Sequence, residues 1–205
     1  MLTAHDIAGD QYQKPTRNPD KPSPLRYSKY ASDLLYFFAI HRVALASHVQ
    51  RFRPDRFSTV RDARRHLQTL ADAGDLTILT YNDPRRPNVY LMTDQGFDRA
   101  SDFMVVPPEA IPASYSEPKG DHILHGLLIT EVAVSRYEFF RRHRTFTHLW
   151  HERFGLFNIN AFTDVVPDFA HGYRSPQGDM IDFVEVLSGG RSITKVKEKL
   201  QKWGD

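Results

Sequence analysis

Two acidic residues in the second half of the chain have a spacing that suits a paired-carboxylate site. Asp168 lies in a strand expected at 165–171, and Glu185 lies in a strand expected at 180–187. A turn expected at 175–179 separates these strands, so a hairpin would bring both carboxylates to one end of a sheet. Neighbouring carboxylates can hold Mg²⁺, and a bound metal can activate a water for hydrolysis. Metal-dependent hydrolysis is therefore the first chemistry to consider.

The surroundings of these acids resemble a known nuclease arrangement. Pro167-Asp168, followed by the run from Ile181 to Glu185, is similar to the Pro-Asp … (Asp/Glu)-x-Lys pattern of restriction-endonuclease-like folds. Glu131, on a helix expected at 121–143, stands where that fold often places a further acid. The resemblance implies Glu131, Asp168 and Glu185 as metal ligands, with Mg²⁺ as the only cofactor and only if the domain is catalytic.

The sequence departs from this pattern at the lysine. Leucine stands two residues after the strand glutamate, so Lys195 or Lys199 of a helix expected at 192–203 would have to substitute. The candidate catalytic set is Asp168, Glu185 and Lys199. We favour a degenerate nuclease-like domain that is not an enzyme, with Asp168 in a turn and Glu185 in a salt bridge to a helix lysine. Active cleavage with Mg²⁺ and a wholly different fold are the alternatives.

A second group of residues, rich in arginine, has the chemistry to recognise double-stranded DNA. Guanidinium forks match guanine edges and phosphates, and a helix fits the major groove. Four of the group lie on a helix expected at 60–73, four lie just before it, and two lie at the tip of the hairpin expected after it. The candidate DNA-contacting residues are Arg51, Arg53, Arg56, Thr59, Arg61, Arg64, Arg65, Gln68, Arg85 and Arg86. A merely solvated helix face and a protein-interaction adaptor are the alternatives.

The elements that must position these arginines follow the order helix, helix, helix, hairpin. In the third helix, the period of 3.6 residues places one apolar stripe opposite the arginines, at Val60, Ala63, Leu67 and Leu70. Ser58 or Thr59 can cap its start, and Gly74 stands where a helix ends. The expected elements are helices at 32–40, 47–52 and 60–73 and strands at 76–81 and 89–93. This order predicts a winged helix-turn-helix domain.

Two resemblances support the same organisation. The run from Leu67 to Gly96 is similar to the helix, Gly, strand, wing, Tyr-x-Leu-Thr-x-x-Gly pattern of bacterial winged-helix proteins. The layout over 32–203 resembles the replication-relaxation family of plasmid- and phage-related bacterial proteins. Besides the wing phrase, the motifs that carry it are His122-Ile-Leu-His125-Gly-Leu-Leu-Ile-Thr-Glu131, Leu149-Trp-His-Glu152, Val166-Pro-Asp168, and Phe183-Val-Glu-Val186 followed by Lys197-Glu-Lys-Leu200.

The family resemblance implies a DNA-binding protein of a mobile element. Its role would lie in plasmid replication, DNA relaxation or the transcriptional control of these processes, with replication or relaxation proteins as further partners. Family members often carry Glu-x-Asp where this chain has leucine at position 187, which weakens the metal site further. A homodimer on an inverted repeat is expected, because one small module rarely gives enough specificity.

The fold class that these patterns predict is α+β, with a winged helix followed by a small α/β domain resembling the nuclease fold. Proline-containing stretches set the expected boundaries. The expected parts are an extended arm at 1–30, a winged helix at 31–104, a proline-rich linker at 105–120 and a restriction-endonuclease-like domain at 121–205.

Composition indicates the class of protein and its expected location in the cell, but it does not identify the function. Hydrophobic residues make up 40% and charged residues 25%, as in ordinary soluble proteins. The chain has no cysteine, which excludes disulfides and thiolate zinc sites, and it has no apolar run of membrane-spanning length, so a cytoplasmic protein without membrane partners is expected. Residues 1–100 hold 15 Lys and Arg against 11 Asp and Glu, whereas 101–205 hold 12 against 14. The first part is therefore the more basic one, as a DNA-facing part would be.

Overall fold

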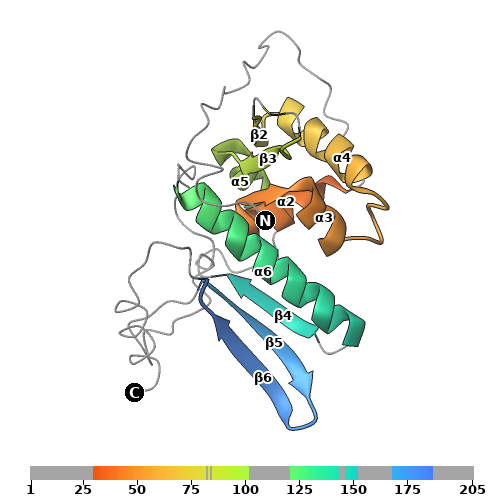
Figure 1. Ribbon diagram of the computed structural model, residues 1–205, viewed down its shortest axis with the longest axis vertical. Coiled ribbons are helices and arrows are strands. Elements are labelled where there is room, and N and C mark those ends of the chain that lie inside the picture. Colours follow the sequence, from red (N-terminus) through yellow and green to blue (C-terminus); the bar gives the residue numbers. More distant parts are fainter. Residues whose placement is uncertain are drawn as a thin grey trace. The chain divides into compact units, whose positions relative to one another are not determined.

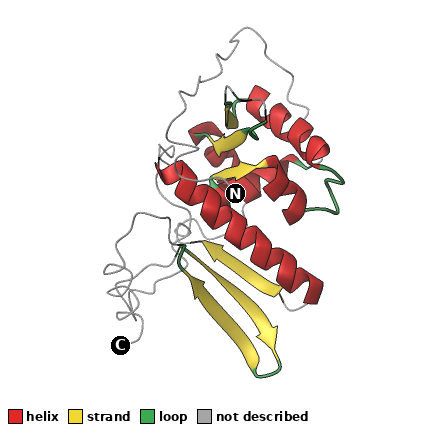
Figure 2. Ribbon diagram, viewed as in Figure 1, coloured by secondary structure: helices red, strands yellow, loops and turns green. Residues whose placement is uncertain are grey.

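The computed structural model describes residues 30–81, 83, 85–101, 121–143, 146–151 and 168–186. It combines helices with antiparallel sheets, which confirms the expected α+β class (Figure 2). The chain forms two compact units. Unit 1 comprises residues 1–105 and 114–134, and unit 2 comprises residues 106–113 and 135–205. The division thus falls inside a helix, whereas the sequence placed the boundary at 105–120.

Unit 1 contains the three helices and the hairpin that the pattern predicts (Figure 1). Its elements are α2 (Ala31–His41), β1 (Val43–Leu45), α3 (Ala46–Phe52), α4 (Val60–Asp72), β2 (Leu76–Leu79), β3 (Val89–Met92), α5 (Asp94–Ser101) and the first part of α6 (Asp121–His143). The short strand β1 was not expected, because three residues are too few for an alternating pattern to be recognised.

The sheet of unit 1 has the order β1-β3-β2, and both pairings are antiparallel. All four residues of the central strand β3 are buried, so both faces of the sheet are covered. On one face, Val89 and Leu91 of β3 form a core cluster with Ile123 and Leu127 of α6. The first part of α6 therefore completes the core of unit 1, which explains why it groups with this unit.

Helix α4 begins and ends as its sequence predicts. The Thr59 side chain accepts a hydrogen bond from the backbone N–H of Asp62 at 3.1 Å and so caps the first turn. Gly74 has a φ of 85°, a conformation that glycine adopts without steric cost. Ala63, Leu67 and Leu70 are buried as expected, but Val60 is 38% exposed. The expectation for Val60 was wrong because this residue lies in the first turn, at the end of the apolar stripe.

Thr93 and helix α5 contact the turn between α4 and β2. The Thr93 hydroxyl lies 2.7 Å from the carbonyl oxygen of Gly74 and 3.0 Å from that of Asp75, and it accepts the N–H of Gly96 at 3.0 Å. A Cβ at Gly96 would lie 2.1 Å from the Asp75 carbonyl oxygen, so only glycine fits there. The Asp75 side chain is fully buried and accepts from Arg99 at 2.5 Å. The Thr-x-x-Gly phrase is therefore explained by this close approach.

Helix α6 approaches β1 through small residues. A Cβ added at Gly126 would lie 2.5 Å from a methyl carbon of Val43. One turn later, the buried Thr130 hydroxyl lies 2.8 Å from the Val43 carbonyl oxygen and 2.8 Å from that of Gly126. The hydroxyl therefore satisfies a strand carbonyl at the contact between helix and strand.

Unit 2 is built from the end of α6 and the strands β4 (Phe146–His151), β5 (Phe169–Ser175) and β6 (Gly178–Val184). The strands form an antiparallel sheet of order β4-β5-β6. The β5–β6 hairpin turns at Ser175–Gly178, where Gly178 has a φ of 121°.

The expected strands of this hairpin were displaced along the sequence. Asp168 lies directly before β5 and Glu185 lies directly after β6, whereas the sequence placed both acids inside strands. The run from Phe169 to Ser175 contains no Val, Ile or Thr, the residues that mark a strand most clearly, so its extent was missed.

Candidate nucleic-acid interface

The outer face of α4 is lined with long polar side chains. Arg61, Arg64, Arg65 and Gln68 are all exposed, while the leucines of the same helix are buried. Because residues three and four apart share a helix face, these side chains form one continuous surface. The helix therefore presents its guanidinium groups away from the core of unit 1.

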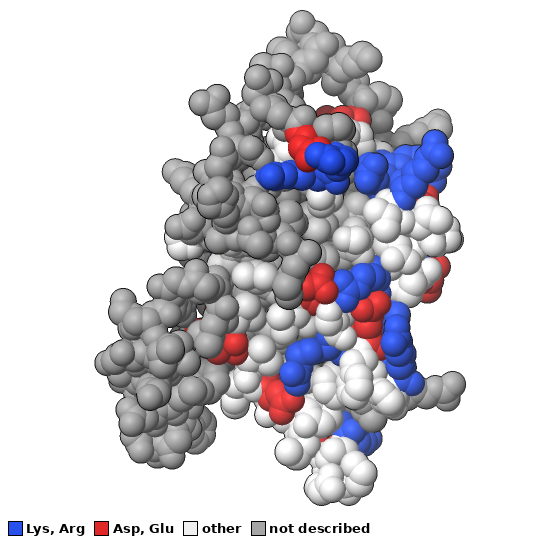
Figure 3. Space-filling view, viewed as in Figure 1, with Lys and Arg blue, Asp and Glu red and all other residues white. Residues whose placement is uncertain are grey.

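The tip of the β2–β3 hairpin carries two further arginines. The backbone N–H of Arg86 donates to the Asp83 carbonyl at 3.0 Å, which closes a tight turn. Arg85 is 90% exposed at its side chain, and the Arg86 guanidinium lies over the Tyr81 ring at 5.5 Å. Figure 3 shows Lys and Arg atoms gathered over the region where Figure 1 draws α4 and the β2–β3 hairpin.

The side chains of this surface differ in whether an acid already binds them. Arg65 pairs with Asp62 at 2.7 Å, and the Gln68 amide donates to Asp72 at 2.9 Å. By contrast, neither Arg61 nor Arg64 forms an ion pair with any residue that the structure describes. The charges of these two arginines are the least compensated on the helix.

Two other candidate arginines hold the loop after α3 against α2. Arg53 pairs with Asp33 at 3.1 Å and with Asp55 at 3.0 Å, and Arg56 approaches the same two carboxylates at 3.7 and 3.4 Å. Hydrogen bonding from Arg53 lowers the pKa of Asp55. Arg56 also lies over the Tyr30 ring at 5.4 Å. Both arginines therefore have structural contacts within unit 1.

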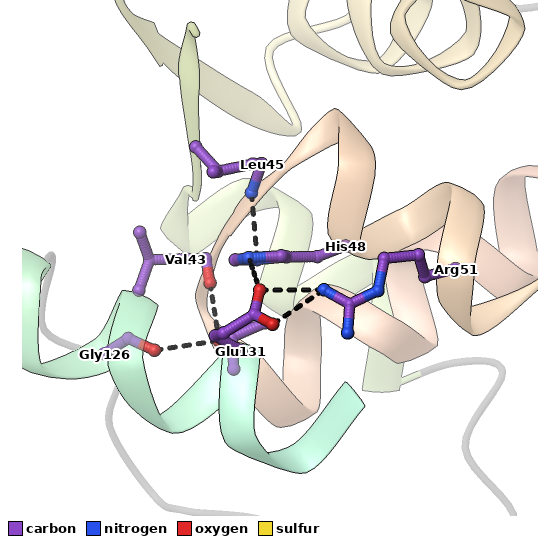
Figure 4. Close-up of polar contacts among 7 residues, drawn as sticks. Val43, Leu45, His48, Arg51, Gly126 and Glu131 are labelled. Carbon is purple, nitrogen blue, oxygen red and sulfur yellow. Dashed lines mark hydrogen bonds and ion pairs between the residues drawn. The ribbon is translucent and has the colours of Figure 1, made fainter. Parts of the chain in front are cut away.

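The remaining arginine, Arg51, joins α3 to α6 through Glu131 (Figure 4). Its Nη1 lies 2.8 Å from both carboxylate oxygens of Glu131, and the buried His48 approaches the same carboxylate at 3.1 Å. The other ring nitrogen of His48 accepts the N–H of Leu45 at 3.3 Å. His48 therefore carries its proton on Nε2, facing Glu131. This contact was missed from the sequence because 80 residues separate Arg51 from Glu131.

The acids proposed for a metal site belong to two different units of the chain. Glu131 belongs to unit 1, where Arg51 and His48 bind its carboxylate, whereas Asp168 and Glu185 belong to unit 2. Within the described ranges, no group of three or more His, Cys, Asp or Glu side chains could hold a metal ion. Lys199, the proposed catalytic lysine, lies outside the described residues.

Asp168 has a structural contact at the open end of the β5–β6 hairpin. Its carboxylate is 5% exposed and accepts the backbone N–H of Val186 at 2.6 Å. Phe169 pairs with Val184, so Asp168 and Glu185 follow at the same end of the two strands, as the hairpin argument expected. A carboxylate that accepts a buried N–H closes the hairpin where the regular pairing stops.

The chain matches no protein-family model, no curated protein and no solved structure. The resemblance to the replication-relaxation family therefore remains a prediction from the motifs. No described helix is long and apolar enough to cross a lipid bilayer.

A buried histidine in unit 2 was not singled out by the sequence. His171 is 1% exposed and lies 3.0 Å from Arg136 and 3.5 Å from Asp182, in contact with the rings of Phe140 and Tyr173. Burial, with the positive charge of Arg136, lowers the pKa of His171 to about 4 against the opposing effect of Asp182. The imidazole is therefore neutral near pH 7. It anchors the end of α6 on β5 and β6.

Proposed function

We propose that unit 1 is a winged helix-turn-helix domain that binds double-stranded DNA. In this proposal α4 enters the major groove, and the β2–β3 hairpin is the wing that contacts the neighbouring backbone. Arg61, Arg64, Arg65 and Gln68 would face the base edges, and Arg85 and Arg86 would reach phosphates.

The observation that carries the proposal is the outward face of α4. Three arginines lie within five positions on this face, and two of them have no ion-pair partner among the described residues. The order of elements in unit 1 and the basic hairpin tip support the same proposal. Arg51, Arg53 and Arg56 serve mainly to hold α3 and its loop in place, because acids within unit 1 already bind them.

The test is a salt series of binding to a labelled duplex, followed by fluorescence anisotropy. For duplex DNA, each phosphate-contacting cation contributes about 0.9 to the slope of log affinity against log salt. We expect a steep negative slope for the full chain. Replacing Arg85 and Arg86, the proposed phosphate contacts, by glutamine should reduce its magnitude by up to about 1.8, and so change the loss of affinity between about 50 and 200 mM salt by about twelvefold. Replacing Arg61 and Arg64, the proposed base contacts, should weaken binding at a fixed salt concentration.

The matched control is Arg174→Gln in the β5–β6 hairpin of unit 2, where Arg174 is 73% exposed. It removes one positive charge from a surface outside the proposed interface and should leave the slope unchanged. An equal effect of the control, or a full chain that binds duplex without dependence on salt, would refute the proposal. Binding of a replication protein by an uncharged contact would then favour the adaptor alternative.

Unit 2 is proposed as a nuclease-like scaffold that does not cleave. What supports this is the buried contact of Asp168 with Val186 N–H, which uses the carboxylate for structure. Incubating plasmid with the protein and Mg²⁺ or Mn²⁺ tests the alternative, since a nicked product that Asp168→Ala abolishes would make unit 2 an enzyme. The biological process proposed is replication, relaxation or transcriptional control of a mobile element, with a homodimer on an inverted repeat.

A further inference from the structure

One arginine of α4 and one arginine of the β2–β3 hairpin are bound by acids of their own turn. At the hairpin tip, Nε of Arg85 lies 3.1 Å from one carboxylate oxygen of Asp83, and Nη2 lies 3.2 Å from the other. This two-pronged geometry is the one in which a guanidinium binds a phosphate. Hydrogen bonding between the partners lowers the pKa of Asp83 and raises that of Arg85, so both remain charged near neutral pH.

The second pair lies at the start of α4. Nη2 of Arg65 lies 2.7 Å from Asp62, although the Arg65 side chain is 75% exposed. Asp62 occupies the first turn of α4, where its charge also interacts favourably with the helix dipole. One arginine of α4 and one arginine of the hairpin therefore form an ion pair with an acid. Neither Arg61 nor Arg64 forms such a pair in the described part of the chain.

We propose that Asp83 and Asp62 act as internal counter-ions of the DNA interface and lower its affinity for any duplex. In the free protein Asp83 occupies a guanidinium that a phosphate would bind, and Asp62 occupies one that a base edge would bind. On binding, the DNA group replaces the carboxylate, and the displaced carboxylate stays close to the polyanionic backbone. This exchange gains less binding free energy than contact with an arginine that has no ion-pair partner among the described residues. Discrimination between DNA sequences therefore rests on Arg61 and Arg64. This inference rests on the proposed function of unit 1.

Asp83→Asn is the decisive variant because it removes charge while preserving the turn. The Asp83 side chain also accepts the backbone N–H of Arg85 at 3.0 Å, and an asparagine oxygen can accept the same bond. We expect tighter binding to a duplex of random sequence. Because Asp83 no longer offsets the charge of Arg85, the salt slope should become steeper by up to about 0.9. The ratio of the affinity of the variant to that of the parent chain should then differ by a factor of about 3.5 between about 50 and 200 mM salt. Asp62→Asn should act in the same direction.

Two matched controls separate release of an interface arginine from a general change in charge. Asp179→Asn removes a carboxylate that binds Arg174 at 2.9 Å in the hairpin of unit 2, where both side chains are also well exposed. Asp72→Asn removes a carboxylate from α4 itself, but one that accepts from Gln68 and not from an arginine. Both controls should change binding to random duplex much less than Asp83→Asn. Circular dichroism spectra that match that of the parent chain are required as a check that each variant is folded.

The possible failures can be told apart. If the full chain binds duplex but Asp83→Asn binds no more tightly, or if Asp179→Asn gains as much, the counter-ion proposal is overturned and the proposed function stands. If neither the full chain nor Asp83→Asn binds duplex at any salt concentration, both proposals fail together.

Discussion

Replacing Gly96 by alanine should destabilise the protein more than replacing Gly126 or Gly178 by alanine. The added Cβ would lie 2.1 Å from the carbonyl oxygen of Asp75, and real Cβ atoms essentially never approach closer than 3.0 Å. The start of α5 must therefore move by about 0.9 Å or more away from the turn that follows α4, because the opposing atom belongs to the backbone and cannot rotate away.

The expected cost follows from the contacts that this movement breaks. Overpacking against a rigid neighbour costs about 1–3 kcal/mol, and the hydrogen bonds of the Thr93 hydroxyl contribute about 1 kcal/mol each. Alanine recovers about 1 kcal/mol through its higher helix propensity. The net loss in the free energy of unfolding is therefore about 3 kcal/mol.

Two other glycines provide an internal scale for this prediction. Alanine at Gly126 would meet a side-chain methyl of Val43 at 2.5 Å, which can shift, so the loss should be about 1 kcal/mol. Gly178 has open space around it but a φ of 121°, so alanine there should cost about 1 kcal/mol through backbone strain in unit 2. Urea unfolding followed by circular dichroism gives the three values, and amide hydrogen exchange identifies the affected unit.

A Gly96→Ala variant as stable as the other two would show that α5 does not contact the Asp75 carbonyl. The variant also tests the proposed interface, because the same turn joins α4 to the β2–β3 hairpin. At a temperature where the variant remains folded, its affinity for duplex DNA should be lower than that of the parent chain.

Four further outcomes follow from single contacts. Thr59→Ala should cost about 1 kcal/mol and Thr59→Ser much less, because serine keeps the cap of α4; thermal unfolding measures both. Glu131→Gln should cost about 1 kcal/mol in urea unfolding, since its carboxylate is almost half exposed and water screens its pairs with Arg51 and His48. Asp168→Ala should destabilise unit 2 by about 1–3 kcal/mol and Asp168→Asn by less, because asparagine keeps an oxygen for the Val186 N–H; equal losses would exclude that role. The folded pKa of His171, about 4, lies below its unfolded value, so its contribution to stability is complete above about pH 6.5 and is lost at up to about 1.4 kcal/mol per pH unit as pH falls toward 4. Urea unfolding at pH 7 and pH 5 should therefore show a smaller loss for His171→Gln than for the parent chain.

Local signals in the sequence were sufficient for much of the fold. The bounds of α6 and β4 agree with the expected ranges 121–143 and 146–151, and the cap and the glycine that bound α4 were recognised from residue type. Contacts between distant segments could not be predicted in this way. The sequence contains no local sign that the first part of α6 would pack on β1, so the expected linker was taken as the boundary between the two units.

The same limit applies to the candidate site, where one residue type has three different environments. The sequence pattern gave no reason to distinguish the arginines around α4 from those of the β2–β3 hairpin, because each lies near the expected interface. In the folded chain, acids from other elements bind Arg51, Arg53 and Arg56, acids of their own turn bind Arg65 and Arg85, and the described part of the chain provides no acid for Arg61 and Arg64. A guanidinium that must first leave a carboxylate contributes less to DNA binding than one that has no carboxylate to leave. The partners of each arginine in the free protein therefore determine which charges the proposed interface presents, and those partners become visible only when the chain is folded.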